Sequence, residues 1–209
     1  MATPTTFVND VLFQSNVTFT GTIQTKFDRT QLAQEPLASY PVKLTDFRVH
    51  DAFQTNLPGT AASDDLGLVG GTFATGSPTL QSSDAKATTV TQYARCMIAM
   101  PPEYDSGETV TIRVHAGMNT TVSDGTATVD VECYEVDQTG GIGSDLCTTS
   151  ATSINSTTNS DKDFSITASG LAPGDILDVR ITIAITDTAT GTAVIGEIGS
   201  VELLCDIRG

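Results

Sequence analysis

The segment from Asp175 to Asp187, DILDVRITIAITD, alternates apolar and polar residues along most of its length. In an extended chain, Asp178, Arg180 and Thr182 point to one side. The aliphatic residues point to the other side: Leu177, Val179, Ile181, Ile183 and Ile185. Because a period of two is typical of a half-buried strand and not of a helix, this segment predicts a sheet with one apolar and one polar face.

The same alternation recurs in other parts of the chain. It is found in GETVTIRVHAG (107–117), in TATVDVECYEV (126–136) and near the C-terminus in VELLCDI (201–207). Turn sequences such as SDGT and LAPGD lie between such segments. About eight strands joined by tight turns predict an all-β fold, an antiparallel β-sandwich of jelly-roll type. An immunoglobulin-like sandwich is the alternative, although the chain has no Trp for the Cys…Trp…Cys pattern of that fold.

Two upstream segments are less regular. PVKLTDFRVHDAF (41–53) is expected to form the first strand of the sandwich, with Phe47 and Val49 available for packing. LPGTAASDDLGLVGGTFATGSP (57–78) is rich in Gly, Asp and Ser, so we expect a loop that contains one short strand near residues 66–73.

The N-terminal segment FVNDVLFQSNVTFTGTIQ (7–24) has apolar residues that recur at intervals of six. A strand this short cannot bury them within its own chain, whereas several copies wound side by side could. We therefore expect residues 1–41 to form an extended oligomerisation or docking arm with a linker, and residues 42–209 to form the sandwich. A single helical turn is expected at 30–35, ended by Pro36. The expected oligomer or capsid contacts are Phe7, Val11, Phe13, Val17, Phe19 and Ile23.

The chain is strongly acidic, with a net charge of −15 and 17% charged residues. An acidic surface repels phosphate groups, so neither nucleic acid nor an anionic membrane is an expected partner. It favours solubility at high local concentration. No signal peptide and no apolar run of about 20 residues is visible, so we expect a soluble protein that is made and folded in a reducing cytoplasm.

Few residues suggest a metal site or a cofactor, and we predict neither. The four cysteines are too far apart for a CxxC site, and Cys133 and Cys205 lie in strand patterns typical of buried free thiols; disulfides are the alternative. The loop acids Asp64 and Asp65, or Asp161 and Asp163, offer oxygen ligands for calcium. Neither pair fits a D-x-D-x-D-G pattern, and solvated loop acids are the simpler explanation.

No catalytic set is evident, and we predict that the chain is not an enzyme. His50 and His115 each end an R-V-H triplet, which fits either two residues that meet at an interface or, more simply, two histidines on solvent-facing sides. No G-x-S-x-G motif is present. The acids of PPEYDSGE could serve a glycosidase, but such residues commonly close hairpins. They are Glu103, Asp105 and Glu108.

A lectin-like function is the strongest binding alternative. Sandwich loops can hold a sugar with Asp, Asn and an aromatic platform. Aromatic residues make up only 6% of the chain, and sheet stability accounts equally well for Tyr93, Tyr104 and Tyr134.

Several segments resemble structural proteins of tailed bacteriophages. NVTFTGTI (16–23) is similar to the V-T-F-x-G units that open trimeric fibre and decoration proteins of these phages. The sandwich region is similar to uncharacterised phage structural proteins. The segments that carry this likeness are PPEYDSGETVTIRVHAGM, TATVDVECYEVD and GLAPGDILDVRITIAITDTATGTAVIGEIGSVELLCDIRG. The resemblance implies a virion component that forms homotrimers through its arm.

From this resemblance and the acidic sandwich we expect a capsid decoration (cement) protein. Its partners would be the major capsid protein and its own copies, and its location the outer capsid surface of the virion. Trimers match local three-fold positions, and three weak arm contacts reinforce one another. A receptor- or glycan-binding fibre module of the head or tail is the alternative. A polysaccharide-degrading fibre domain is a third hypothesis.

Overall fold

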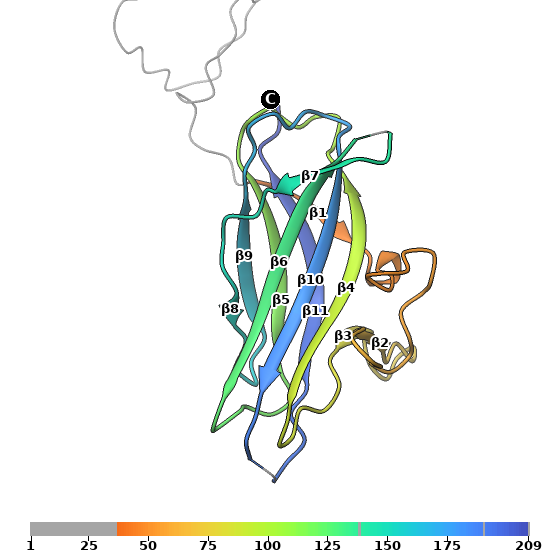
Figure 1. The fold of residues 1–209 in the computed structure, drawn as a ribbon. Coiled ribbons are helices and arrows are strands. Elements are labelled where there is room, and N and C mark those ends of the chain that lie inside the picture. Colours follow the sequence, from red (N-terminus) through yellow and green to blue (C-terminus); the bar gives the residue numbers. More distant parts are fainter. Residues whose placement is uncertain (1–36, 138, 190, 209) are drawn as a thin grey trace, which may run out of the picture. The chain divides into compact units, whose positions relative to one another are not determined.

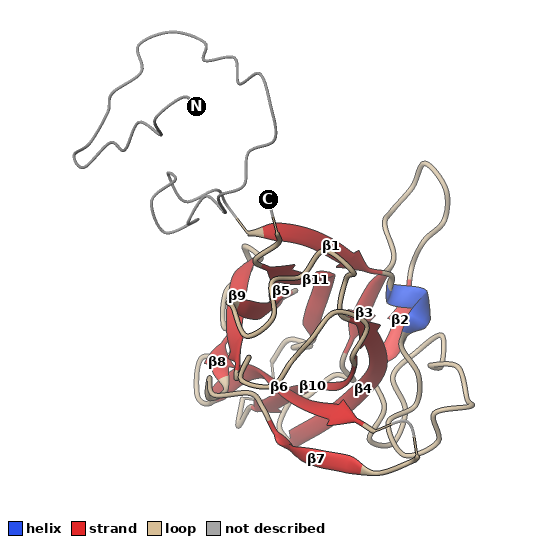
Figure 2. Ribbon diagram, turned by 90° about the horizontal axis from the view of Figure 1, so that it is seen from above, coloured by secondary structure: helices blue, strands red, loops and turns tan. Residues whose placement is uncertain are grey.

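The computed structural model describes residues 37–137, 139–189 and 191–208, which form an antiparallel β-sandwich (Figures 1 and 2). One sheet contains β1 (Ala38–Val42), β2 (Gly67–Val69), β3 (Thr79–Gln81), β5 (Val110–Met118), β9 (Ser160–Ile166) and β11 (Gly196–Cys205). The other contains β4 (Thr89–Ala99), β6 (Thr126–Val136), β7 (Ile142–Asp145), β8 (Thr152–Ser153) and β10 (Ile176–Thr186). We call them the first and the second sheet.

The order of the strands is that of a jelly roll. In the first sheet β5 pairs with one side of β11, and β9 lies beyond β5. The other side of β11 pairs with β1 near one end and with β3 near the other, and β2 lies beyond β3. In the second sheet β10 lies between β4 and β6, and β7 and β8 pair with the far side of β6. If β1 with β3 and β7 with β8 each count as one interrupted strand, and the short edge strand β2 is set aside, the remaining eight strands follow the jelly-roll order. The predicted sandwich is confirmed.

The core lies between the two sheets and is built by the alternation seen in the sequence. Five aliphatic side chains of β10 are fully buried, namely Leu177, Val179, Ile181, Ile183 and Ile185. Ile112 of β5, Leu203 of β11 and Phe164 of β9 contribute to the same core from the first sheet. Since each such side chain stabilises the fold by about 1.5–3 kcal/mol on burial, the register of the central strands is firmly specified.

The prediction that residues 41–53 form the first strand is wrong. Strand β1 ends at Val42, and a 3₁₀ turn, η2 (Leu44–Asp46), follows. Phe47 and Val49 are buried as expected, but only Arg48 between them pairs with β4, through a single bridge to Arg95. Two alternating apolar residues are too few to distinguish a strand from a packed loop. The segment leaves His50 beside the second sheet.

The beginning of the sandwich also differs from the expected boundary. Residues 38–41, which we expected at the end of the linker, belong to β1 and pair with β11. The short strand expected near residues 66–73 is present as β2. The six expected arm contacts (Phe7, Val11, Phe13, Val17, Phe19 and Ile23) and the helical turn at 30–35 lie outside the described residues.

All four cysteines are free thiols, and Cys96, Cys133 and Cys205 are buried. Burial raises the pKa of Cys133 to about 12 and that of Cys205 to about 11. Since the thiolate is the reactive form, these thiols are inert at neutral pH. Within the described part of the chain we find no helix with the length and apolar character needed to cross a bilayer.

Candidate functional site

The outer face of the second sheet carries a compact array of polar and aromatic side chains. Strand pairing places Arg95 of β4, Arg180 of β10 and Glu132 of β6 side by side. The next row toward one end of the sheet consists of Met97, Asp178 and Tyr134. We call the face around these two rows the array.

Arg95 is held by a bidentate ion pair with Asp178. Its Nε donates to Oδ1 at 2.7 Å, and its Nη2 donates to Oδ2. Asp178 is buried, and its hydrogen bonds raise the pKa of the Arg95 guanidinium. The Arg95 guanidinium also lies 5.2 Å from the centre of the Phe53 ring, and its Nη1 donates to the backbone carbonyl of His50 at 3.3 Å. These contacts fix the guanidinium plane.

Arg180 is held in a similar way. Its Nε donates to Oε2 of Glu132 at 2.6 Å, and its guanidinium lies 4.8 Å from the centre of the Tyr93 ring. The Tyr93 ring in turn packs against the His50 ring, with 4.6 Å between the ring centres. Among the described residues, Nη1 of Arg180 has no hydrogen-bond partner. A fixed guanidinium therefore presents a donor at the surface.

An open depression of about 220 Å³ lies over this array. Its walls are formed by His50, Arg95, Tyr134, Ile142, Asp178 and Arg180. Three of the four large apolar side chains that are exposed in the described chain belong to this face: Met97 (44% exposed), Ile142 (58%) and Ile176 (39%). Ile142 lines the depression itself, and Met97 and Ile176 add apolar surface elsewhere on the same face of the sheet.

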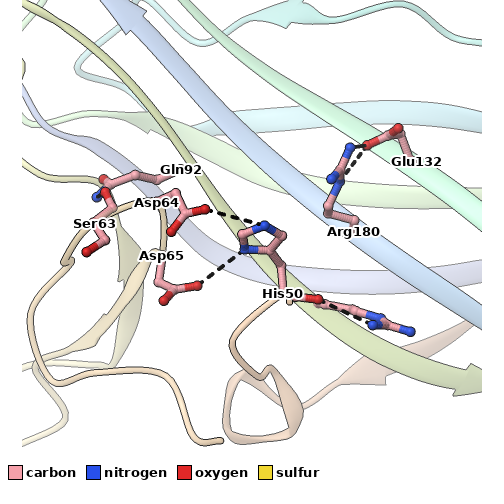
Figure 3. Close-up of polar contacts among 8 residues, drawn as sticks. His50, Ser63, Asp64, Asp65, Gln92, Glu132 and Arg180 are labelled. Carbon is pink, nitrogen blue, oxygen red and sulfur yellow. Dashed lines mark hydrogen bonds and ion pairs between the residues drawn. The ribbon is translucent and has the colours of Figure 1, made fainter. Parts of the chain in front are cut away.

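His50, which lines the depression, also contacts a second group of side chains (Figure 3). Nε2 of His50 lies 3.5 Å from Oδ2 of Asp64, and Nδ1 lies 3.4 Å from Oδ1 of Asp65. The loop that carries both acids is attached to β4, because Tyr93 N–H donates to the Asp64 carbonyl at 2.8 Å. The simpler expectations were that His50 is a solvent-facing strand residue and that Asp65 is a freely solvated acid. The structure contradicts both expectations.

His115 lies on the other sheet and fits the simpler expectation. It sits on the outer face of β5 with Nδ1 2.7 Å from Oδ1 of Asp161. Beside it, Arg113 donates to both oxygens of Asp163 at 2.7 and 2.8 Å and holds the pKa of this carboxyl below its usual value. These partners leave Asp161 and Asp163 poorly placed as calcium ligands. The two histidines belong to separate surfaces and do not meet within this chain.

Two acids of the PPEYDSGE turn, Glu103 and Asp105, contact separate partners. Glu103 accepts a hydrogen bond from Tyr40 O–H at 2.6 Å, which raises the pKa of Tyr40 to about 12. Asp105 lies 3.6 Å from Nε of Arg208. Glu103 and Asp105 therefore link the PPEYDSGE turn to β1 and to Arg208, which follows β11.

Sequence reasoning did not identify the array. The available signal was the polar face of β10, where Asp178 and Arg180 alternate with buried residues. Their partners come from β4 and β6, and the pairing of these strands cannot be read from one sequence.

No protein-family model and no curated protein matches the chain. Among solved structures, it is similar to the CBM22-1 xylan-binding domain of Xyn10C from Paenibacillus barcinonensis (10% identity, 85% of this chain and 98% of that one, TM-score 0.43). It is also similar to the xylan-binding module CBM15 (14% identity, 83% and 99%, TM-score 0.41). A third is the enzymatically active domain of tailspike protein 4 of bacteriophage CBA120 (12% identity, 69% and 18%, TM-score 0.34). Similarities of this size do not establish a shared ligand.

Proposed function

We propose that the sandwich is a carbohydrate-binding module that holds a neutral glycan on the outer face of its second sheet. The observation that carries this proposal is the combination, around one open depression, of fixed Arg–carboxylate pairs, aromatic rings and exposed aliphatic side chains. This is the glycan-binding function that the sequence left as an alternative. The proposed activity is binding without catalysis.

Sugars have the two chemical properties that such a surface can recognise. The C–H faces of a pyranose or furanose ring are apolar and can pack against Tyr134, Met97 and Ile142. The hydroxyl groups are donors and acceptors, so they can pair with Nη1 of Arg180 and with the remaining lone pairs of Asp178 and Glu132. Because ion pairs fix these polar groups, little side-chain entropy is lost on binding.

Charge favours neutral over acidic glycans. Each guanidinium of the array is compensated by its own carboxylate, Asp178 for Arg95 and Glu132 for Arg180. The chain as a whole carries a net charge of −15. A uronic acid or a sulfated sugar would therefore meet no uncompensated cation in the array and a repulsive long-range field.

Capsid decoration is the second candidate, and it rests on a different region. The six-residue apolar interval of the N-terminal arm favours a trimeric virion protein that docks on the major capsid protein. The two functions are compatible, because an arm that holds the particle leaves the sandwich to bind a glycan. In that combination the chain would be a receptor-binding module of the virion.

The glycan proposal is tested by affinity electrophoresis of the full chain in neutral polysaccharides (xylan, mannan and β-glucan) and in acidic polygalacturonate. We expect retardation in at least one neutral polymer and none in the acidic one. Arg180→Ala and Tyr134→Ala should each weaken binding at least tenfold. Arg113→Ala, an equivalent change on the other sheet, should leave binding unchanged. Absence of retardation in all neutral polymers, or equal retardation of all variants, would overturn the proposal.

Two further measurements separate the remaining functions. Release of reducing sugar from a bound polymer would show catalysis and contradict a pure binding role.

For decoration, binding to capsids is compared between the full chain and a variant that lacks residues 2–23. If the truncated chain still forms trimers and still binds particles, the arm is not the docking element.

A further inference from the structure

We propose that His50, Asp64 and Asp65 bind a divalent transition-metal ion such as Zn²⁺. One potential ligand atom from each residue lies within 4.8 Å of the other two. The three residues come from two loops beside β4, and Figure 3 shows both carboxylates on one side of the imidazole, Asp64 next to Nε2 and Asp65 next to Nδ1. His50 also lines the depression of the proposed glycan site, but binding of the ion does not require a glycan.

The donor set selects the class of ion. One imidazole nitrogen and two carboxylate oxygens suit borderline ions such as Zn²⁺, for which three protein ligands and a water are a common arrangement. Calcium prefers six to eight oxygen ligands, which three residues with one nitrogen donor do not supply. We therefore expect Zn²⁺ to bind much more tightly than Ca²⁺.

The backbone around both acids is fixed independently of any ion. Asp65 N–H donates to the Ala62 carbonyl at 2.9 Å, and Ala62 N–H returns a bond to the Asp65 carbonyl at 3.1 Å. The buried amide of Gln92 donates to the carbonyl of Ser63 at 2.9 Å, directly before Asp64. A loop held at this many points presents its carboxylates in a narrow range of positions.

The histidine is oriented as well. Its ring packs on Tyr93, and its carbonyl accepts a hydrogen bond from Arg95. Only 14% of the His50 side-chain surface is exposed, whereas 54% of the Asp64 side chain is exposed. Bonds of about 2.0–2.2 Å to Zn²⁺ place neighbouring tetrahedral ligands roughly 3.4 Å apart. Because Asp65 lies next to Nδ1 of His50 and Asp64 next to Nε2, an ion held by Nδ1 and Asp65 requires the exposed Asp64 side chain to turn toward Nδ1.

The test is isothermal titration calorimetry of the chelator-treated full chain with Zn²⁺ and with Ca²⁺. We expect one Zn²⁺ per chain and at least tenfold weaker binding of Ca²⁺. Asp64→Asn and His50→Gln should each weaken Zn²⁺ binding at least tenfold. His115→Gln removes the other histidine beside an aspartate and should leave Zn²⁺ affinity unchanged. The Cys147→Ser variant should also bind Zn²⁺ with unchanged affinity, which would exclude the partly exposed thiol as the ligand.

Thermal unfolding with and without Zn²⁺ provides a second readout. The midpoint should rise with Zn²⁺ in the unmodified chain and in His115→Gln, but not in Asp64→Asn, whose exposed side chain can be changed without loss of the fold. Lack of saturable Zn²⁺ binding, or equal affinity in Asp64→Asn and His50→Gln, would overturn the proposal. Because no glycan is present, these results are independent of the carbohydrate experiment.

Discussion

The two outer faces of the sandwich carry the same kind of ion pair in different surroundings. On the first sheet, Arg113 makes a bidentate pair with Asp163, whose side chain is 49% exposed. On the second sheet, Arg95 makes a bidentate pair with Asp178, whose side chain is 5% exposed. The second pair is surrounded by rings and apolar side chains. The comparison shows that burial and neighbours, rather than the residue types, distinguish a candidate site from an ordinary solvated surface.

The two R-V-H triplets make the same point. His115 follows Arg113 on a regular strand, so both side chains point to the solvent and meet Asp161. His50 follows Arg48 in a segment with a single bridge to β4, and its ring turns toward Asp64. The same tripeptide therefore forms a solvated ion pair on one sheet and part of a candidate metal site beside the other.

The largest difference between the faces should be seen in stability. Asp178→Asn removes the charge partner of Arg95 within a largely buried pair, and we expect it to lower the free energy of unfolding by about 2 kcal/mol. Asp163→Asn on the first sheet should lower it by about 0.2–1 kcal/mol, because exposed pairs are screened by water. Urea denaturation of both variants measures the difference. Equal losses would mean that burial does not separate the two faces.

The next effect concerns the ring beneath Arg180. Tyr93→Leu removes the aromatic face that supports this guanidinium, a cation–π contact worth about 0.5–1 kcal/mol at an exposed site. We expect roughly threefold weaker glycan binding, whereas Tyr93→Phe should keep full affinity because it keeps the ring. Affinity electrophoresis compares the two variants. If they behave alike, the ring is part of the sheet but not of the proposed glycan site.

The sequence was enough to predict the fold class and the buried face of the main strands, but not the contacts that form the candidate site. The alternation in β10 and β5 is a local property, so the buried face of each strand was predicted correctly. The array depends on which strands are neighbours: Arg95 and Asp178 are 83 residues apart in sequence. Similarly, His50 meets Asp64 and Asp65 only because two irregular segments pack beside β4. A single sequence contains no local signal for such contacts.

The acid response of the first sheet is a smaller effect with a defined sign. Arg113 lowers the pKa of Asp163 in the folded chain, so the ion pair stabilises the fold at a pH above the unfolded pKa of about 3.9. This stabilisation is lost as the pH falls through the lower, folded pKa. We expect the stability difference between the unmodified chain and Asp163→Asn to be present at pH 6 and to disappear in strong acid. Urea denaturation across this range measures it, and a difference that grows with acidity would contradict the assignment.

The smallest effect should come from Asp130, and it has the opposite sign. Asp130 lies on the outer side of β6, where burial and the neighbouring Glu132 and Asp145 raise its pKa more than the Val131 N–H bond and the nearby Arg180 lower it. Its ionised form is therefore slightly unfavourable in the folded chain. Asp130→Asn should stabilise the fold by a few tenths of a kcal/mol at pH 7, and the gain should vanish below about pH 4, where the unmodified residue is also neutral. A loss of stability at pH 7 would mean that this carboxylate supports the second sheet, and the contrast with Asp163 would then fail.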